Sequence, residues 1–366
     1  MAFLNSLLPA AVVLGLLIII HEFGHFLACR LTGVKVEKFS IGFGPEILHW
    51  QGRETRFSLS LLPLGGYVKP AGETVGELAD QEPKKGDYLA APLLSRMVIV
   101  VAGVVMNYFL AFVLFSAIFL IGRPVPGTVV GGFIEGYPAA GSGLLVDDKI
   151  VSVDGTPVET WIQMTDLLSA SGNDTVQLGV LRGQTALEIP VAPKVEDVPD
   201  FFGQKIKVRR IGIQPSQKAD RFERYGLLES LGHGARATIS LTYLTHKAIY
   251  YLVMGKLSIK SMAGPVAIVS MSGTAAQLGL PYVMQLAATL SVSLAVINLL
   301  PIPALDGGHL FFMLIEAVRR KRVSLQFQER ATQAGFVLLM TLLVVVIYND
   351  LSNLQALDKI KNLFGF

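Results

Sequence analysis

The sequence predicts a polytopic α-helical membrane protein with about four transmembrane helices, a membrane-associated β element and an extracytoplasmic α+β domain. Of its 366 residues, 52% are hydrophobic and only 16% are charged, and the mean hydropathy is +0.53. Soluble globular proteins carry about 25% charged residues. Four apolar runs are long enough to cross a bilayer, at 3–28, 97–122, 283–318 with interruptions, and 335–348 with its flanks.

Basic side chains are concentrated in two of the segments between these runs. Between the first two runs lie Arg30, Lys35, Lys38, Arg53, Arg56, Lys69, Lys84 and Lys85. Between the last two lie Arg319, Arg320, Lys321, Arg322 and Arg330. The positive-inside rule therefore predicts that both segments are cytoplasmic and that the stretch from 123 to about 279 is extracytoplasmic. The net charge of +3, without a basic tract, gives no indication of nucleic-acid binding.

Three ionisable residues interrupt the first apolar run, in the stretch LLIIIHEFGHFLA at 16–28. On a helix His21 and His25 are one turn apart and project from the same face, so their imidazoles can bind one metal ion with Glu22 beside them. Each ionisable residue near the centre of a membrane helix costs about 2.5–3.5 kcal/mol on insertion scales, which favours a functional role. Cys29, the single cysteine, is expected to be a small buried residue and not a ligand.

The third apolar run supplies a candidate for the missing ligand. Its helix is expected to break at Pro301, Pro303, Gly307 and Gly308, because an unbroken helix would be too long for one crossing. Catalytic zinc usually has three protein ligands, and Asp306 is a carboxylate in apolar surroundings that needs a cation. His309 is the rival, but we expect it on the cytoplasmic rim, separated from Asp306 by the two glycines.

Between the first two spans, residues 34–72 alternate with a period of two and contain glycines and prolines, which predicts strands and hairpins. An open edge of this element could hold an extended substrate by strand addition; the alternative is a cytoplasmic cap without substrate contact. In the second span, Gly103 and Asn107 suit close helix packing and an interhelical hydrogen bond more than a direct part in catalysis.

The segment 123–215 predicts strands, a short helix from Pro138, a helix at 162–171 and a final hairpin, and it resembles a bacterial PDZ domain. The carboxylate-binding loop of that family has a candidate at 209–213, as in a circularly permuted module, so peptide binding and a steric role are both open. Residues 216–262 predict an amphipathic helix on the outer face, with His233 and His246 at its surface.

HEFGH in the first span and NLLPIPALDGG in the third, joined by the PDZ-like module, resemble the site-2 protease family of intramembrane zinc metalloproteases, and most of all its regulator-of-sigma-E branch. GFGP at 42–45, GGYVKPAGE at 65–73 and GPV at 264–266 extend the resemblance. It implies that His21, His25 and Asp306 bind Zn²⁺, that Glu22 is the general base and that Asn298 lies near the substrate backbone.

The resemblance also implies a bacterial inner-membrane protein that cleaves transmembrane segments of pre-cleaved single-span proteins, such as anti-sigma factors or signal-peptide remnants. The predicted domains are an N-terminal membrane core at 1–122, the PDZ module at 123–215, the amphipathic segment at 216–262 and a C-terminal membrane core at 263–366. The chain has one PDZ module where the best-known enterobacterial form has two.

Two other classes of protein could place such residues in spans. A zinc transporter would carry ionisable residues along a path, whereas here they cluster at one depth. A catalytically silent membrane scaffold with a PDZ module would not need Glu22, because this residue is not required to bind the metal. We therefore expect a zinc metalloendopeptidase.

Overall fold

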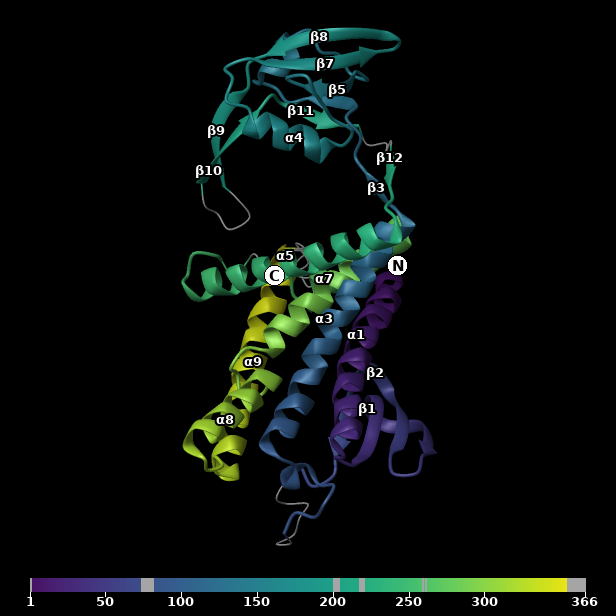
Figure 1. Ribbon diagram of the computed structural model, residues 1–366, viewed down its shortest axis with the longest axis vertical. Coiled ribbons are helices and arrows are strands. Elements are labelled where there is room, and N and C mark those ends of the chain that lie inside the picture. The colour runs from purple at the N-terminus through teal and green to yellow at the C-terminus, as the bar shows by residue number, and fades with distance from the viewer. Residues whose placement is uncertain are drawn as a thin grey trace, which may run out of the picture. The chain divides into compact units, whose positions relative to one another are not determined.

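The computed structural model describes residues 2–73, 82–199, 205–216, 221–258, 260 and 262–353. Contacts divide the chain into two compact units (Figure 1). The first, here called the bundle, consists of 1–118 and 228–366, and the second, the inserted unit, is Phe119–Leu227. The four-domain division made from the sequence stays a prediction.

The helices of the bundle are α1 (Ala2–Thr32), α3 (Leu93–Ile121), α5 (Leu227–Val253), α6 (Pro265–Leu278), α7 (Leu280–Asn298), α8 (Asp306–Arg319) and α9 (Leu325–Asn353), with a short 3-10 helix at Tyr88–Ala90. Among the described residues, four helices are long and apolar enough to cross a membrane: Ser6–Thr32, Leu93–Ile121, Leu280–Asn298 and Gln326–Ser352. The prediction of a polytopic helical protein with four spans is therefore confirmed.

The third span is shorter than predicted, because the run 283–318 forms two helices. α7 ends at Asn298 and α8 begins at Asp306. Pro301 and Pro303 lie in the break, as expected for residues that cannot donate a backbone hydrogen bond. Gly307 and Gly308, which were also expected to break the helix, lie instead in the first turn of α8. A Cβ atom on either would come within 2.3 Å of a carbonyl oxygen of the preceding loop, so their small size lets α8 pack closely on that loop.

The core of the bundle lies between α1, α3 and α7. Val13 and Leu17 of α1 pack with Ala287 of α7, and Phe115 of α3 packs with Val292 of α7. α5 runs across these helices (Figure 1) and contributes Ala237, Leu241 and Ile249 to the second of these clusters. The three helices α1, α3 and α7 therefore contact one another directly.

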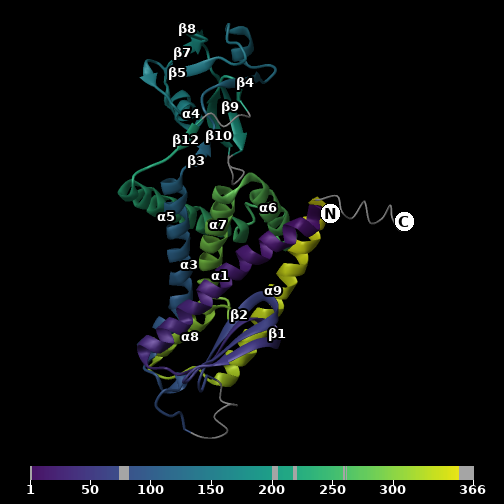
Figure 2. The same ribbon diagram turned by 90° about the vertical axis from the view of Figure 1, so that its right-hand side faces the viewer.

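The β element predicted at 34–72 is confirmed as two strands, β1 (Val36–Gln51) and β2 (Arg56–Pro70), which lie beside α1 (Figure 2). The strands fold back on themselves, so that Phe39 of β1 pairs with both Phe57 and Val68 of β2. Val36 packs with Cys29 at the end of α1, and the thiol is buried, as predicted.

The amphipathic helix predicted within 216–262 is α5. Ser230, Gly234 and Thr238 are buried, whereas Leu228, Ile239 and other apolar side chains are exposed. This pattern is typical of a helix whose outer face contacts lipid. Its position on the extracytoplasmic side stays a prediction.

The inserted unit is an α+β fold with its own hydrophobic core. Its elements are β3 (Arg123–Val125), β4 (Val130–Phe133), a 3-10 helix (Pro138–Gly141), β5 (Lys149–Val153), β6 (Thr156–Pro157), α4 (Trp161–Ala170), β7 (Val176–Arg182), β8 (Thr185–Val191), β9 (Lys194–Pro199), β10 (Lys205–Arg210), β11 (Ile213–Pro215) and β12 (Arg221–Glu223). The main sheet has the order β6-β5-β7-β8, and β4 pairs with β11, β9 with β10, and β3 with β12.

The helix predicted at 162–171 begins one residue earlier because Thr160 and Gln163 form a capping box. Met164 of this helix packs on Ile150, Leu178 and Val180 of the sheet. The inserted unit thus has a buried apolar core of its own, formed between α4 and the sheet.

Candidate metal centre

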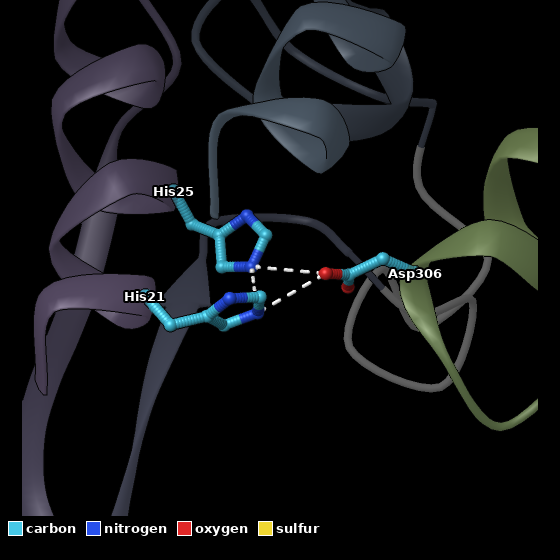
Figure 3. Close-up of side chains that lie close together, drawn as sticks. All are labelled: His21, His25 and Asp306. Atoms are coloured by element: carbon cyan, nitrogen blue, oxygen red, sulfur yellow. Dashed lines mark hydrogen bonds and ion pairs between the residues drawn. The ribbon is translucent and has the colours of Figure 1, made fainter. Parts of the chain in front are cut away.

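Three side chains converge where α1 meets the first turn of α8. The Nε2 atoms of His21 and His25 lie 3.2 Å apart, and Asp306 Oδ2 lies 3.1 Å from the first and 3.6 Å from the second (Figure 3). All three candidate ligand atoms fall within 4.8 Å of one another. They come from segments 285 residues apart in the sequence (306 − 21), so the helix break before Asp306 is what brings the carboxylate to the histidines.

The arrangement fits a zinc ion. Two imidazole nitrogens and a carboxylate oxygen are ligands that zinc prefers, and atoms bound to one tetrahedral zinc ion at about 2.0 Å are separated by about 3.3 Å. The separations here bracket that value. Asp306 Oδ2 is also buried without a hydrogen-bond partner among the described residues, which is costly for a carboxylate unless a cation is nearby.

Glu22 lies beside the three candidate ligands but is not one of the converging residues. Its Oε2 accepts a hydrogen bond from the backbone N–H of Val68 in β2, at 3.0 Å. Gly66 lies next to it, and a Cβ atom there would be 3.6 Å from Glu22 Cγ. The β element therefore positions the carboxylate that the sequence analysis assigned to proton transfer.

The site opens into a cavity of about 330 Å³. Its wall contains Glu22 from α1, Phe43 and Gly66 from the β element, and Leu294 from α7. The candidate ligands His21 and Asp306 also reach this cavity, so a peptide that entered it would meet the metal position and Glu22 together.

Asn298 is the last residue of α7 and lines the same cavity. Its Nδ2 lies 3.4 Å from His21 Nε2. The structure thus brings Asn298 to the site, where its amide faces the space next to the metal position. Its contact with the substrate backbone stays a prediction.

His309 differs from the expectation. The two glycines do not separate it from Asp306, because they are helical, and three residues along a helix lie on the same side. His309 therefore lines the cavity, although its nitrogens are outside the group of converging ligand atoms. Among the described residues Asp306, and not His309, supplies the third converging atom, and its role as a zinc ligand stays a prediction.

α3 contributes contacts that the sequence analysis did not assign to the site. His25 Nδ1 lies 2.8 Å from the backbone oxygen of Ile99, and His21 Nδ1 lies 3.1 Å from the side-chain amide of Asn107. Asn107 does make the interhelical hydrogen bond that its sequence environment predicts, but its partner is a candidate metal ligand. The spacing of Gly103 and Asn107 was the available signal, and it did not identify the partner.

Comparison with known proteins agrees with this geometry. The model of a family described as peptidase family M50 matches residues 9–342. The chain belongs to peptidase family M50. This confirms the resemblance to the site-2 proteases that was based on HEFGH and NLLPIPALDGG, and it agrees with the metal-ligand residue types found at the centre.

Relatives from several bacteria are similar over nearly their whole length. A protein of Rhizobium meliloti is 35% identical over 353 residues, covering 93% of this chain and 94% of the relative. A protein of Mesorhizobium japonicum is 36% identical (95% and 99%), and one of Clostridium acetobutylicum is 33% identical (96% and 98%). All three bear the name "putative zinc metalloprotease".

Part of the chain is similar to solved structures. The PDZ domain of the SdrC-like protein from Listeria innocua is 25% identical and covers 25% of this chain and 96% of its own, with a TM-score of 0.20. The assignment of the inserted unit to the PDZ family stays a prediction.

Proposed function

We propose that this M50 protein is an intramembrane zinc metalloprotease that hydrolyses peptide bonds within transmembrane segments. Its family and the names of its relatives support a metalloprotease with Zn²⁺ as cofactor. The observation that carries the intramembrane site is the convergence of His21, His25 and Asp306, two of which lie inside a helix long and apolar enough to span a bilayer.

His21, His25 and Asp306 would hold the metal and leave one side of it facing the cavity. Zinc in a three-ligand site acidifies water and polarises a carbonyl group. Glu22 is the group that accepts a proton at a carboxylate oxygen and returns it to the leaving amine. Its hydrogen bond from the Val68 amide fixes that carboxylate at the cavity wall.

The β element is suited to hold the substrate. A transmembrane helix has its backbone amides bonded internally, so it must unwind before a peptide bond can be attacked. The Val68 N–H faces Glu22 and not another strand, which indicates that this edge of β2 lies open toward the site. We infer that the extended substrate adds to this edge and that Asn298 contacts its backbone.

The positions of the basic residues support an orientation with the β element and the α8–α9 connection in the cytoplasm. The inserted unit would then be extracytoplasmic, as a PDZ module that contacts peptides or restricts long ectodomains. The substrates would be single-span proteins already shortened outside, of the anti-sigma-factor or signal-peptide-remnant type. The protein would lie in the bacterial inner membrane.

One assay tests the proposal. The purified full-length chain should cleave a reporter with a single transmembrane segment and a short ectodomain in detergent, lose this activity with a zinc chelator, and regain it when zinc is added. Chelator-insensitive cleavage would refute a zinc protease, and failure of a zinc-loaded protein to cleave any such reporter would favour the silent scaffold.

The ligand set is tested in the same assay. Asp306→Ala should lower both zinc content and cleavage because it removes one of three ligands, whereas His309→Ala should largely spare both. Metal analysis that finds full zinc in the Asp306 variant and a loss in the His309 variant would contradict the assignment.

A further inference from the structure

α3 presents one stripe of three residues to the two histidines. Ile99, Gly103 and Asn107 are spaced four apart, so they lie on the same face of the helix. The carbonyl oxygen of Ile99 contacts His25, the side chain of Asn107 contacts His21, and Gly103 lies between them. Ile99 and Asn107 therefore contact the Nδ1 edges of the imidazoles, away from the metal position, and Gly103 lies against the rings themselves.

Gly103 determines how close the rings approach α3. A Cβ atom at this position would lie 2.5 Å from His25 Nε2 and 2.8 Å from His21 Cε1. These separations are shorter than van der Waals contact, so no larger residue fits without moving a ring. The imidazoles thus rest on the backbone of α3, with their planes 85° apart.

The contact with Ile99 decides the tautomer of His25. A carbonyl oxygen only accepts hydrogen bonds, so Nδ1 of His25 carries the proton and donates to it over 2.8 Å. Nε2 is then left with its lone pair directed toward Asp306. This is the form in which a neutral histidine can bind a metal through Nε2.

The contact between Asn107 and His21 is compatible with two orientations of the Asn107 amide. Its Nδ2 lies 3.1 Å from His21 Nδ1, while its Oδ1 is buried without a hydrogen-bond partner among the described residues. A donating Nδ2 would require the proton of His21 on Nε2, where it would block the ligand lone pair. Rotating the Asn107 amide by 180° exchanges its nitrogen and its oxygen, which are nearly the same size. Oδ1 of Asn107 then accepts a hydrogen bond from the Nδ1–H of His21 instead.

We infer that Asn107 is a positioning residue whose side-chain oxygen accepts the Nδ1–H of His21 and so holds the Nε2 lone pair toward the metal. The inference rests on the proposed zinc site. Asn107 is fully buried, and its own backbone oxygen accepts a hydrogen bond from Ser291 of α7 at 2.8 Å, so α7 holds this part of α3 in place. Partners of this kind typically change metal affinity by about 10–100-fold.

The test measures zinc affinity of the full-length protein in detergent, in competition with a chromophoric chelator. Asn107→Leu keeps the size but removes the acceptor, and it should weaken zinc binding by about 10–100-fold. Asn107→Asp keeps two acceptors and should stay within about threefold of the wild type, as partners that accept from a ligating histidine do. Ser116→Ala is the matched control, since Ser116 is a buried polar residue of the same helix whose hydroxyl has no hydrogen-bond partner among the described residues, and it should leave affinity unchanged.

Asn107→Asp distinguishes the two orientations of the Asn107 amide. If the amide donated to His21, Asn107→Asp would weaken binding as much as Asn107→Leu, and the inference would be wrong. Unchanged zinc affinity in a folded Asn107→Leu variant would also overturn it.

A second measurement reads the hydrogen-bond partner of His21 directly. In ¹⁵N-histidine-labelled, zinc-loaded wild-type protein, the Nδ1–H proton of His21, assigned with His21→Gln, should resonate downfield as a hydrogen-bonded proton does, and Asn107→Leu should move it upfield. The same Nδ1–H shift in the wild type and in a zinc-loaded Asn107→Leu variant would overturn the inference. Failure of the wild type to bind zinc would instead refute the proposed function.

Discussion

The two units of the molecule differ in how they bury apolar and polar side chains. In the inserted unit Ile150 and Leu178 are fully buried. In the bundle, Leu8 is 72% exposed and Val344 is 66% exposed, while the amide of Asn107 is fully buried. Water drives the first arrangement through the hydrophobic effect, whereas lipid, which is as apolar as leucine, gives no such driving force to the second.

This difference shows which interactions hold each unit together. The inserted unit is held by a packed apolar core, one capped helix and a four-stranded sheet. The bundle has apolar clusters between its helices, but it also depends on small residues that allow close approach and on buried polar contacts, some of which build the metal centre. A change of one small or polar residue in the bundle should therefore disturb function more than its size suggests.

The largest effect should come from filling the space over the histidines. Gly103→Val places a side chain against both imidazoles, so zinc occupancy and reporter cleavage should fall, cleavage by about 100-fold or more, as for a displacement of about 1 Å in a catalytic site. Gly232→Val is the matched control, because nothing lies within 4 Å of a Cβ atom at that helical position. Equal behaviour of the two variants would show that the close packing on α3 has no functional role.

The next largest effect should come from breaking a buried ion pair. Arg96 of α3 donates to Glu316 of α8 over 2.6 Å, with side chains 7% and 15% exposed. Glu316→Gln leaves Arg96 buried without a charged partner and should lower the free energy of unfolding in detergent by about 3–5 kcal/mol.

The control for that change is the pair Arg30–Glu54, also 2.6 Å apart but with both side chains about half exposed. Glu54→Gln should cost about 0–1 kcal/mol. Denaturant titrations that give the two variants the same loss of stability would contradict the view that buried polar contacts hold the bundle together.

The smallest effect should be a loss of stability at acid pH that is confined to the inserted unit. Arg182 binds both carboxylate oxygens of Asp148 and holds the pKa of that carboxyl below its usual value. The resulting stability is present above the unfolded pKa of about 3.9 and is lost as the pH falls through the lower folded pKa.

Trp161 can report this loss in the full chain, because Trp50 is the other tryptophan of the sequence and can be changed to Phe. The urea midpoint of Trp161 fluorescence should fall between pH 6 and pH 3, and Arg182→Met should reduce that dependence. A pH dependence that is unchanged in the Arg182 variant would show that other groups cause it.

The sequence predicted those features that depend on neighbours along the chain. His21 and His25 are identified by a spacing of four and the spans by apolar runs. Asp306 could be proposed because a carboxylate in an apolar run needs a partner. The break between α7 and α8 was predicted from Pro301 and Pro303, but the glycines were misassigned because glycine serves close packing as well as helix ends.

The role of α3 could not be predicted in the same way. Ile99 acts through its backbone oxygen, which carries no sequence signal at all. Gly103 and Asn107 have the spacing of an ordinary helix-packing pair, and only the fold shows that their neighbours are the histidines. The position of His309 at the cavity likewise depended on whether two glycines continue a helix or end it.

The proposed reaction depends most directly on Glu22, and Glu22→Gln tests this in one preparation. Glutamine keeps the size of the side chain and its reach to the Val68 amide, but it cannot take up the proton that the proposed reaction requires. We expect full zinc content, because His21, His25 and Asp306 are untouched, and a fall in reporter cleavage of about 10²–10⁴-fold. A zinc-loaded variant that cleaves at a near-normal rate would contradict the account.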